Sequence, residues 1–276
     1  MWNYDCDHSI EIHFIEPDTK AISLISAARF PLVRMDFIAT DYVDGVSPTF
    51  DWSGYDSLYA ALQKVGINPI FITPDSKLSE INLALYAPFC KLAAARYPKA
   101  LWVGYNEMRG AKPFVDSNGL PDPAKAVAFL NAVGPAIKAG NPNARIITGE
   151  MAQIDLAWMQ ALVDGGVFKT WTYAGVHPYN IQPYSSIFEA YAALKAILPA
   201  GVPVATTEFG IPSPTPAFVE GFFADHDAMG CPIASLYEFK WTAGFDLDPQ
   251  IDYGIVDANY NPLPAYAQAK ASNQDD

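Results

Sequence analysis

The chain alternates between short apolar segments and longer segments of helical spacing, and it does so eight times. The short segments have the length and apolar content of buried strands, and the longer ones repeat apolar residues at i, i+3 and i+4. The expected strands are 9–14, 32–37, 68–73, 101–107, 145–149, 173–176, 204–208 and 233–239. The expected helices are 18–29, 52–65, 79–97, 124–140, 155–164, 185–198, 217–229 and 263–271. This pattern is typical of parallel strands joined by crossover helices.

Eight strand–helix units without a linker or a shift in composition predict one α/β domain, a single (β/α)8 TIM barrel. The chain has 276 residues, and such barrels need about 250 residues. We therefore expect residues 1–276 to form a single catalytic domain. A hydrophobic content of 51% with only 17% charged residues can supply the large core that this fold requires.

Charge and composition exclude several classes of partner. A formal net charge of -13 lacks the basic footprint that nucleic-acid binding needs. No apolar run approaches the roughly 18 residues of a membrane span. Residues 1–8 have no basic region followed by an apolar stretch, so no signal peptide is expected. Cys6, Cys90 and Cys231 have neither metal nor redox spacing, and we expect buried free thiols.

In (β/α)8 enzymes the catalytic and substrate-binding residues lie at the C-terminal ends of the strands. The polar residues found at the expected strand ends are His13, Arg34, Asp36, Asn106, Glu107, Glu150, His177, Tyr179, Glu208, Glu238 and Trp241. Glu107 and Glu208 stand out because each ends a very apolar strand. A carboxylate in such a place is costly to bury, so we expect it to have either a structural partner or a functional role.

Two carboxylates that face each other across a cleft can hydrolyse a glycosidic bond. One is protonated and donates to the leaving oxygen, and the other attacks the anomeric carbon. Glu107 and Glu208 end the fourth and the seventh expected strand. A separation of about 5–5.5 Å between such carboxyl groups would mean retention through a glycosyl-enzyme intermediate.

The order and strand placement of these motifs resemble the clan A retaining glycoside hydrolases, cellulase-like and xylosidase-like (β/α)8 barrels. The motifs are Asn106-Glu107, Thr207-Glu208-Phe209-Gly210, Arg34 on strand two, His177-Pro178-Tyr179, Trp241, and the segments 253–257 and 262–266. The resemblance implies Glu107 as acid/base, Glu208 as nucleophile, and Asn106 as a partner of the sugar 2-hydroxyl. It further implies that Arg34 supports the nucleophile, Tyr179 orients it, and Trp241 forms an aromatic floor under the sugar. His177 and Asp36 complete the expected substrate-binding set.

Each of these residues also has a purely structural interpretation. Glu107 and Glu208 could pair with a neighbouring arginine, and Arg34 could merely neutralise Asp36 on the same strand face. His177 could satisfy a backbone carbonyl, while Tyr179 and Trp241 could be core residues. His13, Glu150 and Glu238 are expected to be structural or only to line the substrate. The chain also departs from the clan, which often has proline after Asn-Glu where this chain has Met108 and Arg109.

The sequence thus predicts a retaining glycosidase of β-linked substrates without a metal or other cofactor. Long loops after strands two and four suggest an open groove and an internal cut in a polysaccharide. We expect a monomer whose partner is an oligosaccharide or polysaccharide, and action outside the cell or on a virion would suit that substrate class. Two alternatives remain: a metal-dependent hydrolase using His13, Asp36, His177 and Glu208, and a non-catalytic carbohydrate-binding barrel.

Overall fold

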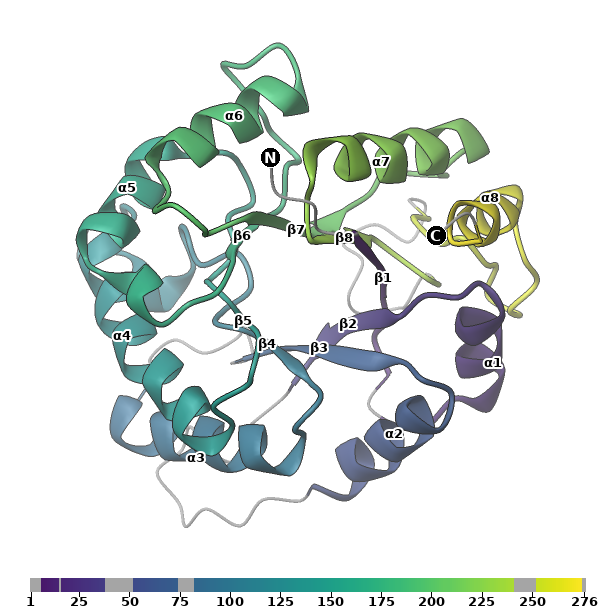
Figure 1. Ribbon diagram of the computed structural model, residues 1–276, viewed down its shortest axis with the longest axis horizontal. Coiled ribbons are helices and arrows are strands. Elements are labelled where there is room, and N and C mark those ends of the chain that lie inside the picture. The colour runs from purple at the N-terminus through teal and green to yellow at the C-terminus, as the bar shows by residue number, and fades with distance from the viewer. Residues whose placement is uncertain (1–5, 15, 38–51, 74–81, 241–251, 275–276) are drawn as a thin grey trace. The chain divides into compact units, whose positions relative to one another are not determined.

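The computed structural model describes residues 6–14, 16–37, 52–73, 82–240 and 252–274. Its eight strands form one sheet in the order β5-β4-β3-β2-β1-β8-β7-β6, which confirms the (β/α)8 barrel (Figure 1). The strands are β1 (Asp7–Glu11), β2 (Leu32–Asp36), β3 (Asn68–Ile72), β4 (Leu101–Val103), β5 (Ile146–Ile147), β6 (Ala174–Val176), β7 (Val204–Phe209) and β8 (Ile233–Leu236). The helices are α1 (Thr19–Ala27), α2 (Ser53–Lys64), α3 (Leu83–Arg96), α4 (Pro123–Gly140), α5 (Leu156–Asp164), α6 (Ile187–Ile197), α7 (Pro216–Met229) and α8 (Pro264–Ser272).

The contacts of the chain divide it into two compact units. The terminal unit comprises residues 1–35, 52–69 and 206–276, and the central unit comprises residues 36–51 and 70–205. Each unit has its own strand pairings and its own core, and each is described by itself.

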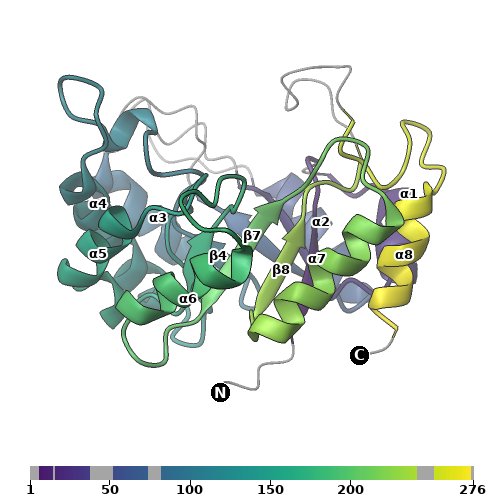
Figure 2. The same cartoon turned by 90° about the horizontal axis from the view of Figure 1, so that it is seen from above.

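In the terminal unit, β1 and β8 are the two inner strands. Strand β1 pairs in parallel with β2, where Glu11 lies opposite Arg34, and with β8, where Ile10 lies opposite Leu236. β7 pairs with β8, with an irregularity in register between Thr206 and Phe209. Helices α7 and α8 lie side by side in Figure 2. The register places Glu11 and Arg34 on adjacent strands at the same level, which matters for the site.

In the central unit, β4 pairs in parallel with both β3 and β5. A parallel bridge from Ile147 to Tyr173 joins β5 to the residue that precedes β6, and so connects the two ends of the strand order. Phe71 and Trp102 lie across this β3–β4 pair with ring centroids 5.2 Å apart, and Tyr97 packs edge-on to Phe71. These buried aromatic rings explain why the segment 101–103 needs no alternating polar residues.

The helices begin where the sequence offers a side-chain cap. Asp18 accepts a hydrogen bond from the Ala21 amide at the start of α1, and Asp155 accepts one from Trp158 at the start of α5. The third helix is capped by Asn82, whereas the expected start at Ser79 lies outside the described residues. Pro98 follows the end of α3, as expected of a residue that cannot continue a helix.

The fourth strand is shorter than its sequence suggests. β4 ends at Val103, and Asn106 and Glu107 lie in a turn rather than in the strand. Glu107 has a positive φ of 46°, a conformation that non-glycine residues rarely adopt. Such backbone outliers are concentrated at functional sites.

Within the described residues, no helix combines the length and the apolar character needed to cross a lipid bilayer.

Candidate active site

In the terminal unit, Glu208 is held by a buried arginine. Arg34 of β2 has no exposed surface, and its Nη1 donates a hydrogen bond of 2.8 Å to Oε2 of Glu208 near the end of β7. The Glu208 side chain is 13% exposed, so one edge of it reaches solvent. An arginine is always charged, so it offers this carboxylate a permanent cation.

Arg34 forms a second ion pair, with Glu11 of β1. The sequence analysis did not select Glu11. The available signal was its place in the alternating first strand, level with Arg34 on the next strand. The Nη1 atom of one guanidinium thus pairs with two carboxylates, of which Glu11 is buried and Glu208 is partly buried. The role of Arg34 in supporting a nucleophile stays a prediction.

A second pair in the terminal unit joins His13 to Glu238. His13 Nε2 lies 3.4 Å from Glu238 Oε2, and both side chains are buried. His13 follows β1 and Glu238 follows β8, which are adjacent strands. The pair therefore lies at the ends of β1 and β8, and β1 is also the strand that carries Glu11.

In the central unit, Glu107 is backed by a histidine. Nδ1 of His177 lies 3.4 Å from Oε1 of Glu107, and Nε2 of His177 lies 3.1 Å from Oε2 of Glu150. His177 and Glu150 are fully buried, whereas the Glu107 side chain is 44% exposed. Both ring nitrogens of His177 face carboxylates, which is a different arrangement from the backbone-carbonyl partner that a lone buried histidine usually has.

The backbone ties these residues together. The Met108 amide donates to the carbonyl oxygen of Glu150 at 2.8 Å, and the Glu150 amide donates to the carbonyl oxygen of Tyr105 at 2.9 Å. The loops after β4 and β5 are thus hydrogen-bonded like a continuation of the two strands. This pairing fixes the turn that carries Glu107 next to the strand end that carries Glu150.

The structure also explains the departure from the clan after Glu107. Met108 is fully buried and packs over Gly149, where an added Cβ would lie 2.6 Å from the Met108 sulfur. Arg109 Nε donates a 2.5 Å bond to Oδ2 of Asp155, the residue that caps α5. Burial raises the pKa of Asp155, but hydrogen bonds from the Trp158 amide and from Arg109 outweigh it and lower the pKa overall.

The remaining predicted residues are placed as follows. Asn106 shares the turn with Glu107, and Tyr179 follows β6 with its side chain 40% exposed and its ring edge-on to His177. Asp36 is the last residue of β2. Trp241 lies outside the described residues, so its role as an aromatic floor stays a prediction. The roles of Asn106, Tyr179 and Asp36 toward a sugar also stay predictions.

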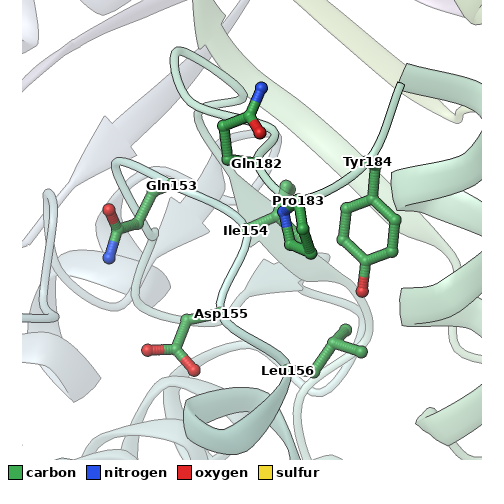
Figure 3. A pocket seen from close by; sticks show the side chains of 7 residues that line it. All are labelled: Gln153, Ile154, Asp155, Leu156, Gln182, Pro183 and Tyr184. Carbon is green, nitrogen blue, oxygen red and sulfur yellow. The ribbon is translucent and has the colours of Figure 1, made fainter. Parts of the chain in front are cut away.

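A cavity of about 300 Å³ lies beside Asp155 in the central unit. Figure 3 shows that its walls come from two segments, residues 153–156 after β5 and residues 182–184 after β6. Gln153, Gln182 and Tyr184 supply polar groups to it, and the Ile154 amide donates to the carbonyl oxygen of Asn180 at 3.1 Å. Through Arg109 and Asp155, the cavity is connected to the turn that bears Glu107.

Comparison with known proteins supports the fold but not a family. No protein-family model matches the chain, and no curated protein sequence is similar to it. Many solved structures are similar, among them a family 39 glycoside hydrolase from Bacteroides cellulosilyticus WH2, with a TM-score of 0.71 and 18% identity. The match covers 97% of this chain but only 63% of that hydrolase.

Two further structures show the same barrel. A monomeric β-xylosidase from Caulobacter crescentus CB15 has a TM-score of 0.74 and 16% identity over 97% of this chain and 68% of its own. A GH5-4 broad-specificity endoglucanase from Clostridium acetobutylicum has a TM-score of 0.70 and 16% identity over 98% of this chain and 97% of its own. The resemblance expected from the sequence is confirmed at the level of the fold: the chain has the (β/α)8 barrel of these glycoside hydrolases.

Proposed function

We propose that the protein is a retaining glycoside hydrolase of β-linked carbohydrates, with Glu208 as nucleophile and Glu107 as acid/base. The observation that carries the proposal is the contrast between the two carboxylates. Glu208 is paired with a permanently charged, buried arginine, and Glu107 is half exposed with a titratable histidine behind it. A (β/α)8 barrel gathers the C-terminal ends of its strands at one face, and Glu107 and Glu208 belong to strands four and seven.

In the first step, Glu208 attacks the anomeric carbon while Glu107 gives its proton to the departing glycosidic oxygen. The C–O bond to the leaving group breaks as the bond to Glu208 Oε forms. In the second step, Glu107, now a carboxylate, takes a proton from water, and the resulting hydroxide displaces Glu208 from the sugar. Two inversions give net retention, and we expect the carboxyl groups to be about 5–5.5 Å apart.

The surrounding residues have defined tasks in this proposal. Arg34 positions the nucleophile, His177 supports Glu107, and Asn106 donates to the sugar 2-hydroxyl. Trp241 forms the aromatic platform under the sugar, and Tyr179 orients the nucleophile. Asp36 contacts the substrate. The cavity beside Asp155, lined by amides and a tyrosine, receives the leaving-group side of the carbohydrate, because hydroxyl groups bind such side chains.

Similar folds belong to a β-xylosidase and an endoglucanase, which supports a carbohydrate substrate without fixing the sugar. The proposal includes an internal cut in a polysaccharide, a single catalytic domain, a monomer, and no cofactor. Incubation with a panel of polysaccharides and with their oligosaccharides tests it. Release of oligomers from long chains supports the internal cut, and release of single sugars alone refutes that part.

Glu208→Gln serves as the control in the panel and should abolish turnover while carbohydrate binding persists. Undiminished hydrolysis by Glu208→Gln or Glu107→Gln would overturn the catalytic assignment. Binding without turnover in the unaltered protein would favour the non-catalytic barrel instead. Treatment with a chelator separates the remaining alternative, because a metal-dependent hydrolase would lose its activity and a two-carboxylate enzyme would keep it.

A further inference from the structure

A second cluster of ionisable side chains lies at the opposite ends of the strands in the terminal unit. Cys6 directly precedes β1, His8 is the second residue of β1, and Asp227 lies in the last turn of α7. The Cys6 sulfur, a ring nitrogen of His8 and a carboxylate oxygen of Asp227 all lie within 4.8 Å of one another. None of these residues has a task in the proposed glycosidase chemistry.

The orientation of His8 follows from its neighbours. The Asn273 side-chain amide donates from Nδ2 to the carbonyl oxygen of Ala28 at 2.8 Å, which turns its Oδ1 toward His8. That oxygen lies 2.6 Å from Nδ1 of His8, so Nδ1 carries the proton and donates it. The His8 ring is also stacked on Phe223 with centroids 4.0 Å apart. The imidazole is therefore held in one orientation.

The other nitrogen points at a carboxylate. Nε2 of His8 lies 3.2 Å from Oδ1 of Asp227, and the His8 side chain is only 3% exposed. In its neutral form, Nε2 presents a lone pair toward the carboxylate oxygen and the nearby sulfur of Cys6. Three ligand atoms that converge in this way are complementary to a cation. A histidine whose Nδ1–H is fixed by a second residue is the usual arrangement for ligation through Nε2.

Distances and donor types favour zinc. Tetrahedral Zn²⁺ with bonds of about 2.0–2.3 Å to oxygen, nitrogen and sulfur requires ligand atoms roughly 3.3–3.7 Å apart. The 3.2 Å between Nε2 and Oδ1 is close to this spacing, and the sulfur lies within 4.8 Å of both atoms. The Asp227 side chain is 42% exposed, which leaves a path from solvent and a place for a water ligand.

A hydrogen bond to a further thiol, Cys231, raises the pKa of Cys6, so zinc would displace the Cys6 proton when it binds. Cys231 is hydrogen-bonded to Cys6, and its own sulfur donates to the carbonyl oxygen of Ile233 at 3.0 Å. Cys231 is fully buried, and we leave it out of the proposed ligand set.

We propose that Cys6, His8 and Asp227 form a zinc site with water as the fourth ligand, which fastens α7 to the beginning of β1. The role is structural, since the metal would join two segments more than 200 positions apart in the chain. The site is independent of the glycosidase proposal, and either can fail without the other.

Zinc uptake by the full-length protein tests the proposal. The protein is freed of metal, equilibrated with Zn²⁺ alone, and passed through a desalting column before elemental analysis. We expect one zinc per chain and a rise in Tm of roughly 5 °C at zinc concentrations about 100 times Kd. Cobalt(II) in place of zinc should give a thiolate-to-cobalt charge-transfer band.

Cys6→Ser should remove the charge-transfer band and weaken zinc binding by at least about 10-fold, and Asp227→Asn should weaken binding similarly. Cys90→Ser is the matched control, because Cys90 is a buried free thiol on α3 of the central unit. It should bind one zinc and keep the band. If Cys6→Ser does not fold, zinc binding by Asp227→Asn tests the proposal instead, since the Asp227 side chain is partly exposed. Sub-stoichiometric zinc, or equal binding by Asp227→Asn and the unaltered protein, would overturn the proposal.

Discussion

The two carboxylates of the candidate active site differ in what stands behind them. Glu208 in the terminal unit is anchored by Arg34, which is buried and shared with Glu11. Glu107 in the central unit faces His177, and its side chain is 44% exposed. A nucleophile must remain an anion in one position, which a permanent cation ensures. An acid/base must gain and lose a proton in every cycle, which suits contact with solvent and with a neighbouring imidazole.

The difference extends to the way each region is held. In the terminal unit, side-chain charges connect β1, β2 and β7 through Glu11, Arg34 and Glu208. In the central unit, backbone hydrogen bonds from Met108 and Glu150 carry the connection, with Arg109 and Asp155 at the periphery. Removal of a charged side chain should therefore lower the free energy of unfolding most in the terminal unit. Removal of a backbone hydrogen-bond donor should lower it most in the central unit.

Arg34→Met should have the largest effect. It leaves the carboxylates of Glu11 and Glu208 without their shared cation, and breaking a buried ion pair in this way costs about 3–5 kcal/mol in the free energy of unfolding. Denaturant unfolding measures the loss. Arg109→Met is the matched control, because its pair with Asp155 is partly exposed and should be worth less than about 1 kcal/mol. Similar losses in the two variants would contradict the distinction between the regions.

Met108→Pro, which restores the residue often found in the clan, should be the next most harmful change. Proline removes the amide that donates to the Glu150 carbonyl, and the shorter side chain leaves space over Gly149. An unsatisfied buried polar group costs about 1–3 kcal/mol, and the lost packing adds to this. Met108→Leu keeps the amide and the volume, so it should lose less than about 1.5 kcal/mol by the same unfolding measurement. Equal stability of the two variants would show that the backbone bond is unimportant.

His177→Phe should lower kcat through Glu107. The expected loss is about 10- to 100-fold, a part of the roughly 10²–10⁴-fold that a general acid contributes. Substrates with poor leaving groups should suffer more than activated aryl glycosides, because only the former need a proton from Glu107. Arg34→Lys is the comparison in the terminal unit and should slow both kinds of substrate alike. An equal loss of kcat on both kinds of substrate in His177→Phe would mean that His177 has only a structural role.

The smallest effect concerns the charge of Asp155. Its pKa is lowered in the folded protein, so its carboxylate stabilises the fold above the ordinary value of 3.8, and this contribution disappears as the pH falls through the lowered folded value. Asp155→Asn keeps a capping side chain but not the charge. We expect a loss below about 1 kcal/mol at pH 7 that vanishes under strongly acidic conditions. A constant difference at both pH values, measured by denaturant unfolding, would exclude the ionic contribution.

The alternation of apolar strands and amphipathic helices was sufficient to predict the barrel. Strand and helix identities follow from local periodicity, and caps such as Asp18 and Asp155 are visible as single residues. The ends of the strands were less accurate. β4 stops at Val103, and Asn106 and Glu107 form a turn that nothing in the apolar run signals.

The site residues were predictable only as candidates at strand ends. The pairing of Arg34 with Glu208 follows a pattern of the clan, whereas the contribution of Glu11 depends on the register between β1 and β2. The partners of His177 likewise come from two different loops, those after β4 and β5. Register and loop packing are properties of the folded chain, which a single sequence does not encode in any short motif.

The assignment of Glu208 as nucleophile and Glu107 as acid/base is tested most directly by azide rescue of alanine variants. The substrate is an activated aryl β-glycoside of the preferred sugar. In Glu208→Ala, azide should replace the missing nucleophile in a single displacement and give the α-glycosyl azide. In Glu107→Ala, the glycosyl-enzyme still forms on Glu208, so azide should displace it and give the β-glycosyl azide. The anomeric configuration of each product is read by proton NMR. We expect opposite anomers in this order, and the reverse order, or the same anomer from both variants, would contradict the assignment of the two residues.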